Sequence, residues 1–193
     1  INELSRFNMN ADSLQKILSS EILPKLDDDS TKHAAVLIVI YGEDNKIIMT
    51  KKPITMQQHA GEISFPGGKI DICDENLLDT AIRETLEEIG LVVPTHKVIG
   101  QLNPVRTRSS GYTIIPFIAI LEQITQLQPN SEVDEILHFP IMPLLQTLEN
   151  VDDPDHLTIS ESYKLTYGDY LIWGASARML KQIADIFKSN QIL

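Results

Sequence analysis

Gly67-Gly68-Lys69-Ile70-Asp71-Ile72-Cys73-Asp74-Glu75 leads into Arg83-Glu84-Thr85-Leu86-Glu87-Glu88-Ile89-Gly90-Leu91, and this stretch determines how the rest of the chain is interpreted. The glycine pair predicts a loop in which the backbone can approach a ligand closely, because glycine has no side chain and tolerates positive φ. The residues that follow predict a helix over about Asn76 to Ile89, since Gly90 is typical of a helix end and Pro94 prevents the helix from resuming.

Three glutamates lie in the second half of this predicted helix. Glu84, Glu87 and Glu88 are spaced i, i+3 and i+4, so their carboxylates share one face within an arc of about 100°. The apolar residues of the helix gather on the opposite side: Leu78, Ile82 and Ile89. Alone, this pattern is typical of the solvated face of an amphipathic helix. Beside a glycine loop it also suits a hard divalent cation such as Mg²⁺, which takes oxygen ligands and shares them with substrate phosphates.

The order of these parts, Gly-x6-Glu-x7-Arg-Glu-x-x-Glu-Glu-x-Gly-Leu from Gly68 to Leu91, resembles the signature of the Nudix hydrolases. One more residue separates Gly68 from Glu75 than in the usual signature, a departure shared by the branch of the family described next. The resemblance implies a Nudix-type α/β/α sandwich with a mixed sheet. It also implies a metal-dependent pyrophosphohydrolase whose metal-binding acids are Glu84, Glu87 and Glu88.

The residues before the glycines resemble the coenzyme A pyrophosphatase branch of that family. Thr50, Gly61 and Phe65-Pro66-Gly67-Gly68 match its motif, whereas Lys52 and Gln57 stand where the branch has arginines. Lysine keeps the charge but loses the bidentate fork, and glutamine loses the charge as well. Further matches extend the resemblance from about Val36 to the C-terminus. The substrate-binding residues implied or suggested here are Lys52, Gln57, Gly61, Phe65, Arg108 and Tyr112.

Arg108 and Lys69 are cations that could capture a phosphate, and Tyr112 could stack on a base. The alternatives are a surface ion pair for Arg108, simple exposure for Lys69 and strand packing for Tyr112. Trp173 is predicted to lie in the core.

Composition limits the classes of partner. With 193 residues, of which 42% are hydrophobic, we expect one domain over 1–193 in which 1–32 form an N-terminal helix and linker. A net charge of −11 argues against nucleic acid or an anionic membrane as the main partner. Cys73 is the single cysteine, which excludes an internal disulfide. No apolar run is long enough to span a membrane and no signal peptide is visible, so we expect a cytoplasmic protein. A homodimer is compatible with the sequence.

The remaining segments predict interleaved helices and strands. An apolar face formed by Leu14, Ile17, Leu18 and Ile22 predicts a first helix that ends at Pro24. Further helices are predicted over about 143–149 and 176–188. The predicted strands cover about 34–41, 46–52, 63–65, 97–102, 112–121, 135–139, 157–163 and 164–173. Loops are expected over 53–62, 103–111 and 122–133, an acidic linker over 26–32 and a turn over 152–155. The fold class is therefore α/β (α+β), with a mixed sheet between helices.

The expected chemistry is in-line attack of water on a phosphoanhydride, with Mg²⁺ or Mn²⁺ as the cofactor. We expect Glu84 and Glu88 as the first metal ligands, Glu87 to complete the cluster and the Gly68 carbonyl to add an oxygen. Arg83 is expected to pair with one of these glutamates. Glu87 and Glu135 are the alternative general bases.

The resemblance implies coenzyme A or its derivatives as the small-molecule substrate, cleaved to 3′,5′-ADP and 4′-phosphopantetheine. Because Gln57 lacks the expected charge, another nucleotide such as ADP-ribose or a dinucleotide is the alternative. A non-catalytic nucleotide-binding module predicts a degraded signature, and all four of Arg83, Glu84, Glu87 and Glu88 are present.

Overall fold

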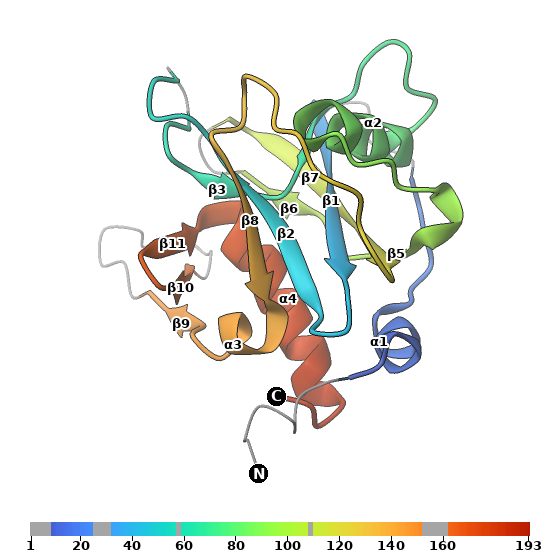
Figure 1. The fold of residues 1–193 in the computed structure, drawn as a ribbon, viewed down its shortest axis with the longest axis vertical. Helices are drawn as coiled ribbons and strands as arrows, with labels where there is room; N and C mark the ends of the chain where they lie inside the picture. Colours follow the sequence, from blue (N-terminus) through green and yellow to red (C-terminus); the bar gives the residue numbers. More distant parts are fainter. Residues whose placement is uncertain (1–8, 25–31, 57–58, 108–109, 152–161) are drawn as a thin grey trace.

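The computed structural model describes residues 9–24, 32–56, 59–107, 110–151 and 162–193. Within these residues, an eight-stranded sheet lies between helices and a second, three-stranded sheet adjoins it (Figure 1). The helices are α1 (Ala11–Leu18), α2 (Leu77–Ile89), α3 (Ile141–Leu145) and α4 (Gly174–Ser189). The strands are β1 (Lys32–Tyr41), β2 (Lys46–Lys51), β3 (Ile63–Ser64), β4 (Gly67–Lys69), β5 (Val98–Gln101), β6 (Val105–Arg106), β7 (Tyr112–Leu121), β8 (Glu135–Pro140), β9 (Glu149–Asn150), β10 (Tyr163–Tyr167) and β11 (Tyr170–Trp173).

Strand β1 is the centre of the large sheet. It pairs in parallel with β7 over its whole length, from Lys32 opposite Tyr112 to Tyr41 opposite Leu121. Its other edge is shared, because the C-terminal end pairs with β2 and the N-terminal half pairs with β4, both antiparallel. One parallel pair among antiparallel ones makes the sheet mixed, which confirms the predicted fold class.

The two faces of the sheet bury separate hydrophobic clusters because side chains alternate along each strand. Ile38 and Ile118 pack with Phe187 on the face covered by α4, which runs behind the sheet in the view of Figure 1. Leu37 and Phe117 pack on the opposite face, with Ile89 of α2. The central strands β1 and β7 are thus buried on both faces, and each buries seven consecutive residues.

The first helix is shorter than predicted. Asn10 caps it, but it ends at Leu18, and the backbone N–H of Ser20 then donates to the carbonyl of Ile99 in β5. Leu14 and Leu18 belong to the cluster beneath α4, whereas Ile22 packs against the opposite cluster. The helical spacing of these residues was therefore misleading, because a chain that pairs with β5 cannot continue as a helix.

Two predictions in the C-terminal third were wrong. The helix predicted over 143–149 is α3, which begins at Ile141, where the N–H donates to the carbonyl of Asn45. Glu149 instead lies in β9, opposite Lys164. Trp173, predicted to be buried, is 52% exposed because it alternates with the buried Ile172 along β11.

Other predictions agree with the structure to within a few residues. The hairpin β1–β2, the long strand β7, the strand β8 and the helix α4 lie where they were expected. The loop predicted over 103–111 contains the short strand β6. The turn predicted over 152–155, and most of the linker over 26–32 and of the strand over 157–163, fall outside the described residues. No helix among the described residues is both long and apolar enough to cross a membrane.

Candidate functional site

Helix α2 has the well-defined ends that its sequence predicted. The side-chain oxygen of Asn76 accepts hydrogen bonds from the N–H groups of Leu78 and Asp79, at 2.9 and 3.2 Å, and satisfies two of the free donors at the start of the helix. Gly90 ends the helix in the left-handed conformation, with φ of 69°. Ile89 and Ala81 are buried beneath the helix, which fixes the rotation of α2 about its axis.

The glycine pair is a strand rather than a loop. Gly67 and Gly68 belong to β4, in which Gly68 lies opposite Ala35 of β1. A Cβ atom on Gly68 would overlap the carboxyl group of Glu84 and lie 2.7 Å from its Oε2. The N–H of Gly67 donates to Oε2 of Glu88 at 3.3 Å. The absence of side chains on β4 therefore lets two carboxylates of α2 approach its backbone.

Glu88 does not lie on a solvated face. It is only 4% exposed, and burial is the main reason that its pKa rises from 4.5 to about 7. The ammonium group of Lys52 and the N–H of Gly67 oppose this rise, whereas Glu84 and Glu132 add to it. Burial also raises the pKa of Glu84, against the opposing effect of Arg83. The interpretation of these glutamates as an ordinary solvated face is therefore wrong for Glu88.

Arg83 connects the acids of the helix with the loop before it. Its guanidinium contacts Glu84 Oε1 at 3.0 Å and Glu87 Oε2 at 3.1 Å. It also forms a two-point contact with Asp74, at 2.8 and 2.9 Å, and this contact is the main reason that the pKa of Asp74 falls to about 2. Sequence reasoning assigned no role to Asp74. Its position shortly before the helix could have suggested one. Arg83 thus fixes Glu84 and Glu87 relative to the loop.

The residues around the glycine pair suit a divalent cation. The carboxylates of Glu84 and Glu88 both face β4, and carboxylate and carbonyl oxygens are the ligands that Mg²⁺ and Mn²⁺ prefer. A buried carboxylate such as Glu88 is stabilised in its charged form by a cation. Within the described residues, no three acidic, cysteine or histidine side chains already converge in a metal-binding geometry, and Arg83 contacts both Glu84 and Glu87. Binding would therefore require these side chains to adjust.

Glu132 is an acid that sequence reasoning missed. It lies in the segment between β7 and β8, which bonds to the end of α2 through the N–H of Asn130 and the carbonyl of Glu88, at 2.9 Å. The side chain of Asn130 then accepts the N–H of Glu132 at 2.8 Å. The charge of Glu132 makes a small contribution to the raised pKa of both Glu84 and Glu88, for which burial is the largest cause. An Asn two residues before a Glu is the only sequence signal for this turn.

Glu135 is engaged by two partners outside α2. Its Oε1 accepts a hydrogen bond from the hydroxyl of Tyr170 at 2.6 Å, and its Oε2 lies 3.9 Å from the Nζ atom of Lys51. It is not among the main electrostatic influences on Glu84 or Glu88. The structure therefore does not join Glu135 to the carboxylates of α2.

The other predicted substrate residues fall into three groups. Lys52 lies near Glu88, and its carbonyl accepts the N–H of Gly61 at 3.1 Å, so Gly61 lies beside Lys52. Phe65 is 2% exposed and packs in the core, so we leave its side chain out of the site. Tyr112 is partly exposed at the start of β7. Gln57 and Arg108 lie outside the described residues.

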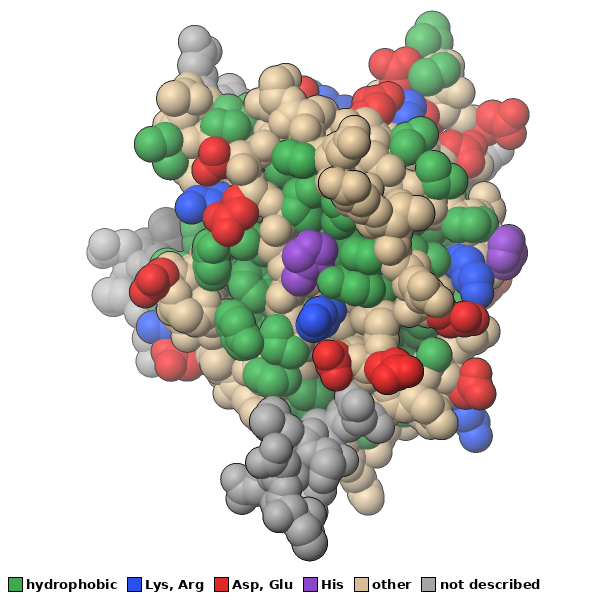
Figure 2. All heavy atoms as spheres, in the orientation of Figure 1, with side chains coloured by type: hydrophobic (Ala, Val, Ile, Leu, Met, Phe, Trp, Pro, Cys, Tyr) green, Lys and Arg blue, Asp and Glu red, His purple; other side chains and the backbone are tan. Residues whose placement is uncertain are grey.

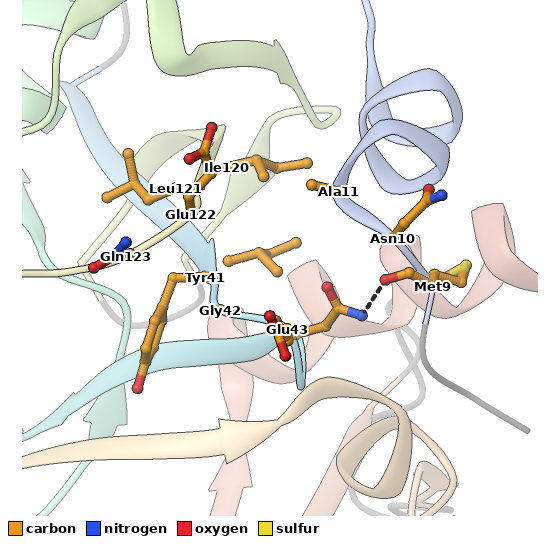
Figure 3. A pocket seen from close by; sticks show the side chains of 12 residues that line it. Met9, Asn10, Ala11, Tyr41, Gly42, Glu43, Ile120, Leu121, Glu122 and Gln123 are labelled. Carbon is orange, nitrogen blue, oxygen red and sulfur yellow. Dashed lines mark hydrogen bonds between the residues drawn. The ribbon is translucent and has the colours of Figure 1, made fainter. Parts of the chain in front are cut away.

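The segment that precedes α2 projects from the surface of the molecule (Figure 1 and Figure 2). In Figure 2, acidic and hydrophobic side chains project together from the upper right, where Figure 1 places the segment that precedes α2. A pocket of about 650 Å³ lies elsewhere, at the C-terminal ends of β1 and β7 (Figure 3). Glu43 and Glu122 line this pocket, and no lysine or arginine among the described residues does, so its described lining does not suit a phosphate. Gly68 pairs with the opposite, N-terminal half of β1, and the chemistry of the acids is therefore separate from this pocket.

Comparison with known proteins identifies the family. The model of the NUDIX domain matches residues 31–161. The chain is 32% identical over 170 residues to the uncharacterized Nudix hydrolase NudL of Photorhabdus laumondii, covering 84% of this chain and 88% of that protein. It is 35% identical over 155 residues to the mitochondrial coenzyme A diphosphatase NUDT8 of Mus musculus, covering 75% and 72%. Among solved structures, a MutT/nudix family protein from Enterococcus faecalis matches with a TM-score of 0.56 at 14% identity, covering 98% of this chain and 74% of that one. The chain therefore belongs to the Nudix hydrolase family.

Proposed function

We propose that this protein hydrolyses the phosphoanhydride of coenzyme A or its derivatives and releases 3′,5′-ADP and 4′-phosphopantetheine. The observation that supports the chemistry is the approach of two partly or fully buried carboxylates, Glu84 and Glu88, to the backbone of β4. The substrate is supported by the matches at Thr50, Gly61 and 65–68, and by the coenzyme A diphosphatases of human and mouse among the relatives.

The glutamates of α2 have distinct roles in this proposal. Glu84 and Glu88 would hold Mg²⁺ or Mn²⁺, with Glu87 and the carbonyl of Gly68 as further oxygen donors. The bound cation would neutralise charge on the phosphate oxygens and lower the pKa of a water molecule. Arg83 is a positioning residue, because its contacts at 3.0 and 3.1 Å fix the carboxylates of Glu84 and Glu87.

A carboxylate must also accept the proton of the attacking water. Glu87 is half exposed on α2, and Glu132 lies on the segment that bonds to the end of α2. Glu132 is exposed and Glu87 contacts Arg83 at 3.1 Å, whereas the carboxylate of Glu135 is engaged by both Tyr170 and Lys51. We therefore propose Glu87 or Glu132 as the base, and place Glu135 third.

The test is to incubate coenzyme A with the protein and Mg²⁺ or Mn²⁺ and to separate the products. The proposal predicts 3′,5′-ADP and 4′-phosphopantetheine in equal amounts, and no cleavage in EDTA. Glu88→Gln, which keeps the shape of the side chain, should reduce turnover by at least about 100-fold. Intact coenzyme A under all conditions would contradict the substrate, and full activity of Glu88→Gln would contradict the assignment of the acids.

A second substrate class keeps the same chemistry. Gln57 stands where the coenzyme A branch has an arginine, and this observation favours a nucleoside diphosphate derivative such as ADP-ribose or a dinucleotide. A panel of diphosphate compounds assayed under the same conditions separates the two. A third outcome, binding without cleavage of any compound, would indicate a non-catalytic nucleotide-binding module.

A further inference from the structure

Two lysines contact one tyrosine ring at the N-terminal end of the central strands β1 and β7. The Nζ atoms of Lys32 and Lys69 lie 5.7 and 5.2 Å from the centre of the Tyr112 ring, within the range of a cation–π interaction. Lys32 is directly opposite Tyr112 in the β1–β7 pair, and Lys69 comes from β4 on the other side of β1. The backbone of Tyr112 is held in place, because its N–H donates to Oγ1 of Thr107 at 2.8 Å.

The charges of this pair are not neutralised by acids. Five lysines elsewhere in the described residues have a carboxylate oxygen within 4.0 Å: Lys46, Lys51, Lys97, Lys164 and Lys181. Neither Lys32 nor Lys69 has such a partner within the described part of the chain, although the protein carries a net charge of −11. Two ammonium groups that share a ring repel one another, and an anion with more than one negative charge would relieve this repulsion.

The position of Lys69 connects this pair with the acids of α2. Lys69 directly follows Gly68, so their Cα atoms are about 3.8 Å apart. Because side chains alternate along a strand, the Lys69 side chain leaves β4 on the face opposite to the one where Gly68 meets Glu84. An extended lysine side chain adds about 6 Å, so the ring lies within about 15 Å of Gly68. The two sets of groups thus lie on opposite faces of β4, and a substrate that binds both must pass around the end of the sheet.

We propose that Lys32 and Lys69, positioned by the ring of Tyr112, bind a phosphate monoester carried by the ribose of the substrate. This inference rests on the proposed function, because it requires a phosphoanhydride at the acids of α2. The ligand class is a 3′-phosphorylated adenosine diphosphate derivative. The extra phosphate is the group that separates coenzyme A from ADP-ribose and from dinucleotides, so the two lysines determine which of these substrates the enzyme prefers.

The first experiment measures binding without turnover. The affinities for 3′,5′-ADP and 5′-AMP are compared by calorimetry in EDTA, since the two nucleotides differ only in the 3′-phosphate. Wild-type protein should prefer 3′,5′-ADP, and each lysine should account for about tenfold of the preference, as expected for a charge-assisted hydrogen bond. The double variant Lys32→Gln/Lys69→Gln should lose the preference with little change in binding of 5′-AMP. Lys188→Gln, which removes one exposed charge from the end of α4, is the matched control and should retain it.

Tyr112 is tested by a conservative pair of variants. Tyr112→Phe keeps the aromatic ring and should retain the preference for 3′,5′-ADP, whereas Tyr112→Leu should reduce it about as much as loss of one lysine. A purely structural role for Tyr112 would instead weaken the binding of both nucleotides equally in Tyr112→Leu.

The outcomes separate this inference from the proposed function. Equal affinity of the wild-type protein for the two nucleotides, or a preference that survives in the double variant, would overturn the lysine site even if coenzyme A is hydrolysed. A preference that depends on both lysines supports the site, even if coenzyme A is not cleaved and the proposed reaction fails. Where coenzyme A is cleaved, kcat/KM of the double variant for coenzyme A should be about 100-fold lower than that of the wild type, because KM rises. Its kcat/KM for 3′-dephospho-coenzyme A should be unchanged.

Discussion

Replacing Gly68 by alanine should inactivate the site without unfolding the protein. The new Cβ would overlap the carboxyl carbon and Oε1 of Glu84 and lie 2.7 Å from Oε2, so the carboxylate must move by about 1 Å to reach ordinary contact distance. The end of a flexible side chain can move in this way at little cost in stability. A displacement of about 1 Å in a group that positions the reaction can, however, cost about 100-fold in rate.

Gly67→Ala is the matched control for this prediction, because the same added methyl group meets the backbone instead. Its Cβ would overlap the carbonyl of Ala35 and lie 2.6 Å from the Cα atom of Val36, and the φ of Gly67 is 155°. Neither β1 nor this φ can adjust cheaply, so we expect a loss of at least about 3 kcal/mol in the free energy of unfolding.

The assay is thermal unfolding together with metal-dependent hydrolysis of coenzyme A, for both variants and the wild-type protein. Gly68→Ala should melt within about 4 °C of the wild-type protein and turn over about 100-fold more slowly. Gly67→Ala should melt far lower. A Gly68→Ala protein with wild-type turnover would refute the reasoning that Glu84 must lie against the backbone of β4.

Three further predictions concern acids near the glycine pair. Asp74→Asn should lower the free energy of unfolding at pH 7 by about 2 kcal/mol. The pKa of Asp74 is depressed from 3.8 to about 2, so the stability that its charged form contributes is present above pH 4 and is lost as the pH falls through 2. Urea titrations should therefore show that the difference in the free energy of unfolding between variant and wild type shrinks at acid pH. For Glu88 the pH dependence of the free energy of unfolding has the opposite sign. Its pKa is raised from 4.5 to about 7, so metal-free protein should lose up to about 3 kcal/mol of stability as the pH rises from 4.5 to above 7, and Glu88→Gln should abolish most of this loss in EDTA. Finally, Glu132→Gln should slow hydrolysis more than Glu135→Gln, because Glu132 acts electrostatically on the acids of α2 while Glu135 is bonded to Tyr170. Equal rates of the two variants in steady-state assays would contradict the placement of Glu132 in the site.

The sequence was most informative where local signals agree with one another. Helix α2 could be predicted because Asn76 and Gly90 provide caps at both ends and the apolar residues keep a helical period. The position of Glu84 beside the glycine pair followed from the resemblance to the family signature. The burial of the Glu88 side chain could not be predicted, because it depends on β4 and Lys52, which come from distant parts of the chain.

The predictions failed where long-range pairing determines the structure. Glycines rarely favour strands, so nothing local indicates that Gly67 and Gly68 pair with β1. The contribution of Glu132 arises from the bond between Asn130 and the end of α2, across a gap of more than 40 residues. The exposure of Trp173 follows from which face of β11 turns inward, and a short strand with apolar residues on both faces does not specify this.

Anomalous diffraction from a crystal soaked in Mn²⁺ tests the central claim most directly, because it locates the cation without relying on turnover. The account predicts a Mn²⁺ peak between the carboxylates of Glu84 and Glu88 and the carbonyl of Gly68, and no peak there in a crystal of Glu88→Gln. A wild-type crystal in which these carboxylates face solvent, with no ion between them and β4, would contradict it.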